Sequence, residues 1–496
     1  MKKKIVLGSA AALVIACAGW AGGAFYAGKS VEATLDKQHK WLSDLPYFVV
    51  KSREYQRGWF SSSETVTLAV NPEMYRLFLE KEGQELPKFE VTYSNKVLHG
   101  PFPLIGQFSL RPAKAVVQTE FKFAPETQKL LSRFFGAQKP IEMENRIGFD
   151  DDGVIQIKVP GFDYEEAVSG VKAKWQGLTA TVDYGGDFNR VKLNAVAPGM
   201  SGSAKEKGNF SFSGLTLDVD HQRGKAGMML GTTSAKLAGF SLDVPDGLPV
   251  KVALENLAYN TKLAESGDFI NGEATISLAR IILNDKPYGP AELQAEASHL
   301  HGPTLAKLND EFNKLQKRPL KREEATAEIV KLAKAHGMPI LTNDPRFGIR
   351  KLEVQLPEGA LKFSASVGLK GFQEKDLDNP VDFVNKLSAK ADFSIPRKVV
   401  ETLVMWQTRA MFGGPESGVS GADLDYLASQ FVEGQIGRLA DQKLIKVDGE
   451  LLSASATLES GEFTLNEILV PLPWQEEEFR KKQQETQASQ VTQTQQ

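Results

Sequence analysis

Long stretches of this chain alternate apolar and polar residues, and no other feature constrains the fold as strongly. The clearest runs are Leu178–Tyr184, Val191–Ala197, Leu361–Leu369 and Leu452–Leu458. A period of two residues is typical of a strand with one face buried and the other in water. Antiparallel sheets are often built this way, whereas strands of parallel sheets are apolar throughout. The chain is therefore predicted to be dominated by antiparallel β-structure.

Turn residues support this interpretation. Glycine-containing segments at Asp151–Gly153, Tyr184–Asp187 and Leu356–Gly359 separate pairs of alternating runs and are typical of hairpin connections. Within Phe210–Val219 the apolar positions change phase at Gly214, which predicts a bulge or a bend there.

Several segments instead carry apolar residues at helical spacing. Helices are predicted at Ala124–Phe135, Pro303–Gln316, Lys321–His336, Pro396–Met411 and Ala422–Asp441. The expected fold class is α+β and dominated by β-structure. It comprises one or more large curved antiparallel sheets with flanking helices, behind one N-terminal transmembrane helix.

The N-terminus predicts a membrane anchor. Three lysines at positions 2–4 precede an uncharged run from Ile5 to Gly28, and about 20 apolar residues suffice for a helix to cross a bilayer. The positive-inside rule keeps Met1 in the cytoplasm and directs the rest of the chain outward. Two alternatives stay open. One is a cleaved secretion signal, and the other is a lipoprotein acylated at Cys17, since Val14–Cys17 loosely resembles a lipobox.

The chain is expected to divide into five parts. These are a stub and anchor at 1–29 (membrane span 5–28), a larger β-rich region at 30–302, a helical segment at 303–342, a smaller β-rich region with helices at 343–474, and a polar tail at 475–496. The tail is almost free of apolar residues, so it is expected to be disordered.

Composition excludes several classes of function. The net charge of −3 gives no basic stripe for nucleic acid, and Cys17 is the one cysteine of the chain, so disulfides and cysteine-based metal sites are excluded. His299 and His301 are the one close histidine pair and lack a third ligand with matching spacing. Asp150–Gly153 is interpreted as a turn rather than a calcium loop. No catalytic, cofactor-binding or metal-binding residue is predicted.

Two segments stand out as motifs and are interpreted as structural. The first is Tyr55–Ser62, in which Tyr55, Trp59 and Phe60 are expected to anchor the segment in the core, while Gly58 permits a bend. The second is a turn at His99–Pro101. The motif residues are Tyr55, Arg57, Gly58, Phe60, Ser61, Ser62, His99, Gly100 and Pro101.

At these motifs the chain resembles the YdgA family of bacterial envelope proteins, which is defined by a domain of unknown function. The resemblance also rests on Phe25–Lys29 and Gly289–Leu293 and extends over nearly the whole exported length. It implies an anchor in the inner membrane of a Gram-negative bacterium and a β-rich periplasmic domain. It implies no activity.

Three functions are compatible with these features. The first is a non-enzymatic, membrane-anchored periplasmic protein whose sheet binds a hydrophobic or polymeric envelope ligand, such as a lipid, or an envelope-protein partner. The second is an envelope hydrolase with an unrecognised serine or carboxylate site. The third is a scaffold that holds partners near the membrane. An apolar groove favours the first, a Ser–His contact or paired carboxylates favour the second, and a solid sandwich favours the third.

The anchor can be tested by carbonate extraction of membranes. We expect the protein to stay in the pellet, because residues 5–28 span the bilayer. Cys17→Ala should behave in the same way, because the anchor does not depend on acylation. A soluble protein that begins near residue 24–30 would contradict the anchor.

Overall fold

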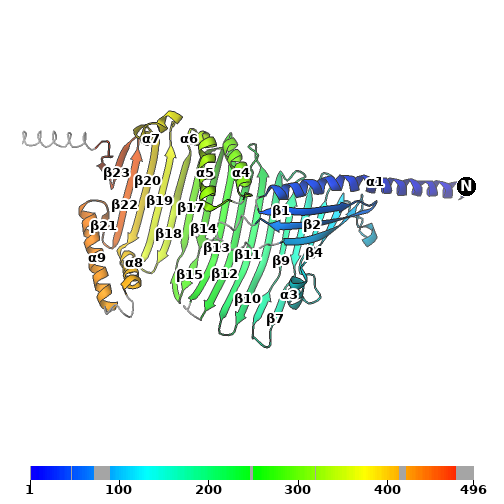
Figure 1. Ribbon diagram of the computed structural model, residues 1–496, viewed down its shortest axis with the longest axis horizontal. Helices are drawn as coiled ribbons and strands as arrows, with labels where there is room; N and C mark the ends of the chain where they lie inside the picture. Colours follow the sequence, from blue (N-terminus) through cyan, green and yellow to red (C-terminus); the bar gives the residue numbers. More distant parts are fainter. Residues whose placement is uncertain are drawn as a thin grey trace, which may run out of the picture. The chain divides into compact units, whose positions relative to one another are not determined.

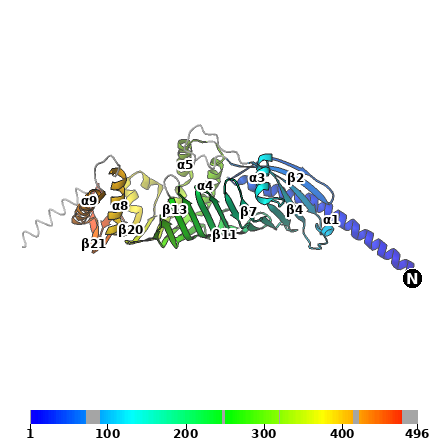
Figure 2. The same cartoon turned by 90° about the horizontal axis from the view of Figure 1, so that it is seen from below.

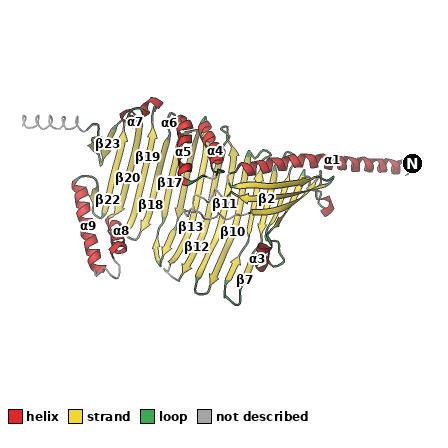
Figure 3. Cartoon of the chain, in the orientation of Figure 1, coloured by secondary structure: helices red, strands yellow, loops and turns green. Residues whose placement is uncertain are grey.

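A computed structural model describes residues 2–45, 47–71, 90–245, 250–318, 320–412 and 421–475, with side chains from residue 22 onward except at 322, 410 and 412. Strands dominate (Figure 3). The chain forms two compact units. Unit 1 comprises residues 1–264 and 303–337, and unit 2 comprises residues 265–302 and 338–496.

Unit 1 consists of a long antiparallel sheet and several helices (Figure 1). Its helices are α1 (Lys2–Asp44), α3 (Pro125–Phe135), α4 (Gly302–Leu315) and α5 (Arg322–His336), with a short 3-10 turn η1 (Ile105–Gln107). Its strands are β1 (Phe48–Gln56), β2 (Ser61–Val70), β3 (Glu90–His99), β4 (Ala115–Lys122), β5 (Glu142–Ile147), β6 (Gly153–Val159), β7 (Phe162–Glu165), β8 (Lys172–Trp175), β9 (Leu178–Tyr184), β10 (Arg190–Ala204), β11 (Gly208–Arg223), β12 (Met229–Val244) and β13 (Val250–Ser266).

The strands of unit 1 pair mostly in chain order. Strands β1 to β6 are successive antiparallel neighbours, β9 follows β6, and β10 to β13 continue from β9. The β7–β8 hairpin joins through β8 to β10. Figure 2 shows β2 and its neighbours curling over α1, so that the helix lies on the concave side of this part of the sheet. The core here comprises Val31 and Leu35 of α1 with Val97, Ala115, Val117 and Ile147 of the strands.

Unit 2 has the same construction. Its strands are β14 (Phe269–Leu278), β15 (Arg280–Leu283), β16 (Lys286–Tyr288), β17 (Ala291–His301), β18 (Arg346–Leu356), β19 (Gly359–Leu369), β20 (Leu387–Pro396), β21 (Lys446–Asp448), β22 (Leu451–Glu459), β23 (Glu462–Leu465) and β24 (Ile468–Val470). Its helices are α6 (Met338–Leu341), the 3-10 turn η2 (Glu374–Leu377), α7 (Pro380–Lys386), α8 (Arg397–Phe412) and α9 (Gly421–Asp441).

The main ladder of unit 2 runs through β14, β17, β18, β19, β20, β22, β23 and β24, and each of these pairs is antiparallel. Helices α8 and α9 pack against β20 and β22. Their core contains Ile395, Val399, Val432, Ile436 and Leu452.

Much of the predicted secondary structure is confirmed. The five predicted helices coincide within one or two residues with α3, α4, α5, α8 and α9, and the four alternating runs lie in β9, β10, β19 and β22. The tail beyond residue 475 and the side chain of Cys17 lie outside the described residues. Among the residues described with both backbone and side chains, no helix is both long enough and apolar enough to cross a membrane.

The phase change at Gly214 belongs to a bend that four strands share. On one side of the bend the apolar residues Ala197, Leu215, Leu237 and Leu257 pair across β10 to β13, and on the other side Met200, Phe212, Phe240 and Leu254 do so. The pairing register continues unchanged between the two rows, so no residue is inserted. Gly214 (φ +61°) and Asn256 (φ +52°) lie between the rows in the left-handed region. Such a residue turns two consecutive side chains to the same side, so both rows belong to one face.

Gly214 is therefore predicted to be intolerant of a side chain. Its Cβ would lie 2.7 Å from the Cβ of Ala238, and a left-handed backbone costs a branched residue roughly 1–2 kcal/mol or more. We expect Gly214→Val to lower the free energy of unfolding by at least that amount in urea titrations of the full-length protein. Gly106→Val is the control, because no atom lies within 4 Å of its added Cβ. Equal stability of the two variants would contradict the shared bend.

Candidate functional site

The second half of α1 packs on the sheet of unit 1 through both apolar and polar contacts, and this contact region is called the docking site. Val31 and Leu35 are 0% and 2% exposed and supply the apolar contact. Full burial of each such side chain contributes roughly 1.5–3 kcal/mol. Around them, polar side chains of α1 meet polar side chains that the strands direct inward.

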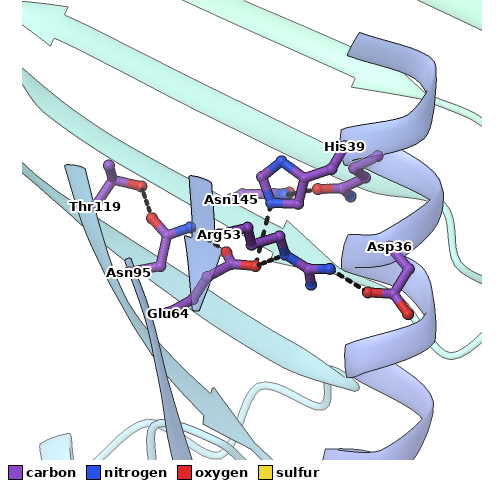
Figure 4. A network of polar contacts seen from close by, with 8 residues as sticks. Asp36, His39, Arg53, Glu64, Asn95, Thr119 and Asn145 are labelled. Atoms are coloured by element: carbon purple, nitrogen blue, oxygen red, sulfur yellow. Dashed lines mark hydrogen bonds and ion pairs between the residues drawn. The ribbon is translucent and has the colours of Figure 1, made fainter. Parts of the chain in front are cut away.

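Glu64 is the centre of this docking site (Figure 4). Its side chain is fully buried, and one carboxylate oxygen accepts hydrogen bonds from Arg53 Nε at 2.6 Å and from His39 Nε2 at 3.1 Å. The other oxygen accepts from Asn95 Nδ2 at 2.7 Å. Thr119 donates to Asn95 at 2.7 Å, so the network crosses from β4 to the helix.

The partners of Glu64 keep it ionised. Burial alone raises the pKa of this carboxyl, but the hydrogen bonds from His39 and Arg53 outweigh burial and hold the pKa below its ordinary value. Arg53 also binds Asp36 of α1. A buried charge is tolerated only with such partners, because an unpaired charge loses its hydration without compensation.

Two further polar contacts join α1 to the sheet. Gln38 donates to the hydroxyl of Tyr184 at 2.8 Å, which itself donates to Asn145 at 2.9 Å. Thr34 donates to the carboxylate of Asp151 at 2.7 Å, and Lys114 binds the same carboxylate. Burial raises the pKa of Asp151, but the hydrogen bonds from Lys114 and Thr34 give a net lowering.

The two sequence motifs meet at the beginning of this docking site. Ser62 and His99 are 5% and 2% exposed, and Ser62 Oγ lies 3.1 Å from His99 Nε2. His99 Nδ1 lies 3.0 Å from the carbonyl oxygen of Ala24 and donates to it. Burial lowers the pKa of His99. The neutral ring thus donates a hydrogen bond through Nδ1 to the carbonyl of Ala24 and accepts one from the Ser62 hydroxyl through Nε2.

Small residues permit the close approach of helix and sheet. A Cβ on Gly28 would lie 2.7 Å from the His99 ring, and one on Gly100 would lie 3.2 Å from Ala24. Pro101 contacts the position where Gly23 would carry a side chain. The segments Phe25–Lys29, Tyr55–Ser62 and His99–Pro101, which are distant in sequence, therefore form one contact region.

The expected burial of Trp59 and Phe60 in the segment Tyr55–Ser62 is wrong. Trp59 and Phe60 are 65% and 43% exposed, so they do not anchor the segment in the core; Tyr55 does pack against it. Trp59 instead contacts Phe25 of α1, with ring centroids 5.2 Å apart. Gly58 is required because a Cβ at this position would collide with the carbonyl oxygen of Ser61. Its backbone is not in the left-handed conformation, so the requirement is steric.

The remaining motif residues lie at the rim of the docking site. Arg57 pairs with Glu32 of α1 at 3.5 Å and lies 5.9 Å from the ring of Phe25. Ser61 is exposed at the start of β2. In unit 2, His299 of the close histidine pair stacks on Phe269, with ring centroids 4.7 Å apart.

Sequence reasoning missed Glu64, Asn95, Asn145 and His39. The signal was present in the strands, because Ser62, Glu64 and Val66 occupy alternate positions of β2 and so share one face. Polar residues at apolar-face positions indicate a buried polar network, whose partner on α1 no short motif identifies.

Beyond α1, the same face of the unit 1 sheet is apolar, and among the described residues several of its side chains are partly exposed. Val182 and Ala180 of β9 share the face of Tyr184, and they pair with Leu193 and Ala195 of β10, whose row continues through β11 and β12. Large apolar side chains here keep 37–41% of their surface exposed: Phe210, Leu215, Tyr259 and Leu263. The opposite face carries polar pairs such as Lys192–Asp220 at 2.8 Å.

Unit 2 also has one apolar and one charged face. Its apolar rows include Ile276, Leu293, Leu352, Phe363 and Phe393, which pair in this order across β14, β17, β18, β19 and β20. Ile276, Phe347, Val367 and Phe393 are 39–45% exposed. The other face carries ion pairs such as Lys351–Glu292 at 2.7 Å. Exposed apolar surface of this kind is typical of binding sites.

Comparison with known proteins confirms the resemblance to the YdgA family. Residues 1–473 match the family described as "Bacterial protein of unknown function (DUF945)". Protein YdgA of Escherichia coli (strain K12) is 25% identical over 476 residues, which cover 90% of this chain and 91% of the relative. No solved structure matches the chain.

The buried carboxylate gives a test of the docking site. Glu64→Gln should lower the free energy of unfolding by about 3 kcal/mol at pH 7, because Arg53 and His39 lose their common anion. Glu54→Gln is the control, since Glu54 is an exposed carboxylate on β1. The measurement is urea unfolding of the full-length proteins.

The effect of Glu64→Gln on the free energy of unfolding is predicted to depend on pH. A lowered folded pKa contributes stability that is fully present above the unfolded carboxyl pKa of about 4.3 and lost as the pH falls through the folded value. The difference in the free energy of unfolding between wild type and Glu64→Gln should therefore become smaller below about pH 4. A difference that stays constant from pH 7 to pH 3 would mean that Glu64 is not ionised in the folded protein.

Proposed function

The chain belongs to a bacterial family of unknown function, so no relative supplies an activity, and we propose a function from the geometry of the molecule. In this proposal, the protein is a non-enzymatic, membrane-anchored periplasmic binding protein. It holds a hydrophobic envelope ligand on the open apolar faces of its sheets. The main observation in favour of this proposal is the shared bend in β10–β13, because it keeps the apolar side chains of four strands on one face.

The energetic argument is that a solvent-exposed apolar face is costly. Burial of apolar surface contributes about 25 cal/mol per Å², and a soluble monomer rarely leaves a large contiguous patch uncovered. A left-handed residue in a strand also carries a conformational cost at Asn256. If the phase of the alternation changed without this bend, the apolar residues on one side of the change would point to the polar face of the sheet. Preservation of the face across the bend supports a ligand that occupies it.

The anchor is part of the proposal. The lysines at positions 2–4 and the apolar run from Ile5 support a helix that enters the inner membrane from the cytoplasm. Because Ala24, Ala27 and Gly28 are buried on unit 1, the proposed span ends near Gly23 and is shorter than the span 5–28 expected from the sequence. Residues 5–23 at 1.5 Å per residue cover roughly 28 Å, close to the thickness of the hydrocarbon core.

A hydrolase is the second candidate, and the contact between Ser62 and His99 is the observation that favours it. The neutral imidazole accepts a hydrogen bond from the serine hydroxyl, which is the arrangement that a general base requires. Both side chains are nearly fully buried beneath Gly28, however, and the third partner is a backbone carbonyl of α1. The geometry supports a docking contact more strongly than a nucleophile, which must reach its substrate.

Paired variants test the apolar faces. Leu217→Glu combined with Val367→Glu places a charge on the apolar face of each unit. The control combines Thr216→Glu with Ser366→Glu, the neighbouring positions on the polar faces. The probe is the apolar dye N-phenyl-1-naphthylamine, titrated by fluorescence into full-length protein in amphipol, with empty amphipol as background.

We expect the apolar-face pair to weaken dye binding roughly tenfold or more, because each ligand contact would require a carboxylate to be desolvated. The control pair should bind like wild type, and both pairs should keep the wild-type melting temperature. Equal dye binding by the two pairs, or no saturable binding by wild type, would refute the proposed function.

A further inference from the structure

An apolar recess of about 220 Å³ lies in unit 2 between the helices α8 and α9 and the sheet. Apolar atoms form its exposed surface, and the lining residues include the polar Gln435 and Ser453. The recess is larger than the engineered cavity of about 150 Å³ that binds benzene. The residues that define it are Phe393, Ile395, Val404, Phe431, Ile436 and Leu452.

The recess has a closed end and an open end. Ile395, Ile436 and Leu452 form the inner wall and are 6–7% exposed, whereas Phe431 and Phe393 are 59% and 39% exposed. Phe393 also belongs to the apolar row that crosses β14, β17, β18, β19 and β20. The open apolar face of unit 2 therefore leads into the recess at Phe393.

We propose that the recess holds the methyl end of a fatty acyl chain, whose remaining length lies along this row on the apolar face. The inference rests on the proposed function and names its ligand class. Four strand intervals of about 4.8 Å separate β14 from β20, which gives roughly 19 Å, a length that an extended acyl chain covers.

The chemistry of the surface favours an acyl chain over a peptide. An extended peptide would bring its N–H and C=O groups onto rows of Ile, Leu and Phe side chains, where they would lose water without gaining partners. A hydrocarbon chain carries no such groups. Its polar head would remain in solvent beyond the row.

Two photoreactive palmitic acids test the placement. One carries a diazirine near its methyl end, and the other carries it next to the carboxyl group. Each is bound to full-length protein in amphipol, irradiated, and mapped by peptide mass spectrometry. We expect the methyl-end probe to label residues 395–404 and 431–445, and the carboxyl-end probe to label β14–β19.

Val404→Trp fills the recess and should reduce methyl-end labelling of α8 and α9 at least fivefold. Leu403→Trp is the matched control, because Leu403 is the preceding residue, lies 56% exposed and does not line the recess. It should label within twofold of wild type. Ile445 also lines the recess, so Ile445→Trp replaces Val404→Trp if that variant does not fold.

The outcomes separate the two proposals. Loss of methyl-end labelling in the filled variant alone supports the acyl site. Equal methyl-end labelling of α8 and α9 in Val404→Trp and Leu403→Trp, or methyl-end labelling confined to the open face, overturns the site while the proposed function stands. Labelling by neither probe of the recess or the apolar face refutes both.

Discussion

An antiparallel sheet with one apolar face needs something to cover that face, and the described residues of unit 1 bury its two parts to different extents. Helix α1 lies over the strands that carry Val97, Val117 and Ile147 and buries them almost completely. Farther along the same face, Leu215 and Tyr259 keep about two-fifths of their surface in solvent. Among the described residues, apolar side chains over β10–β13 are thus less completely buried than those under α1, and this difference is the physical basis of the proposed ligand site.

The covered part is specified by polar contacts rather than by apolar packing alone. An apolar helix stripe could slide or rotate on a sheet at little cost, because hydrophobic contacts have no direction. The buried carboxylate of Glu64 can be satisfied only when His39 and Arg53 reach it, and the carbonyl of Ala24 must meet His99. These contacts fix the register of α1, in the way that buried polar groups fix the register of coiled coils. The helix that carries the proposed anchor is therefore held to unit 1 in one position.

Secondary structure could be predicted from local patterns, whereas the site could not. The alternation in Leu178–Tyr184 and the helical spacing in Ala422–Asp441 depend on neighbouring residues, so the sequence determines both elements closely. The burial of Trp59 and Phe60 was predicted wrongly, because aromatic residues gain burial only where tertiary contacts enclose them. The polar network joins α1 to strands up to 146 residues away, as in Gln38 and Tyr184, and no local pattern reports such pairs. The interpretation of His99–Pro101 as a turn omitted its contact with Ala24 for the same reason.

The most direct measurement of the central claim is the mass of the protein with whatever it carries from the envelope. Full-length protein is extracted from the membrane fraction of the cells that produce it into amphipol and examined by native mass spectrometry, followed by organic extraction of the same sample. The account predicts discrete adducts that the organic phase removes and that contain aliphatic chains. Protein that carries no adduct while its melting temperature and circular dichroism remain native would contradict the account, because the folded protein would then not need a bound envelope ligand.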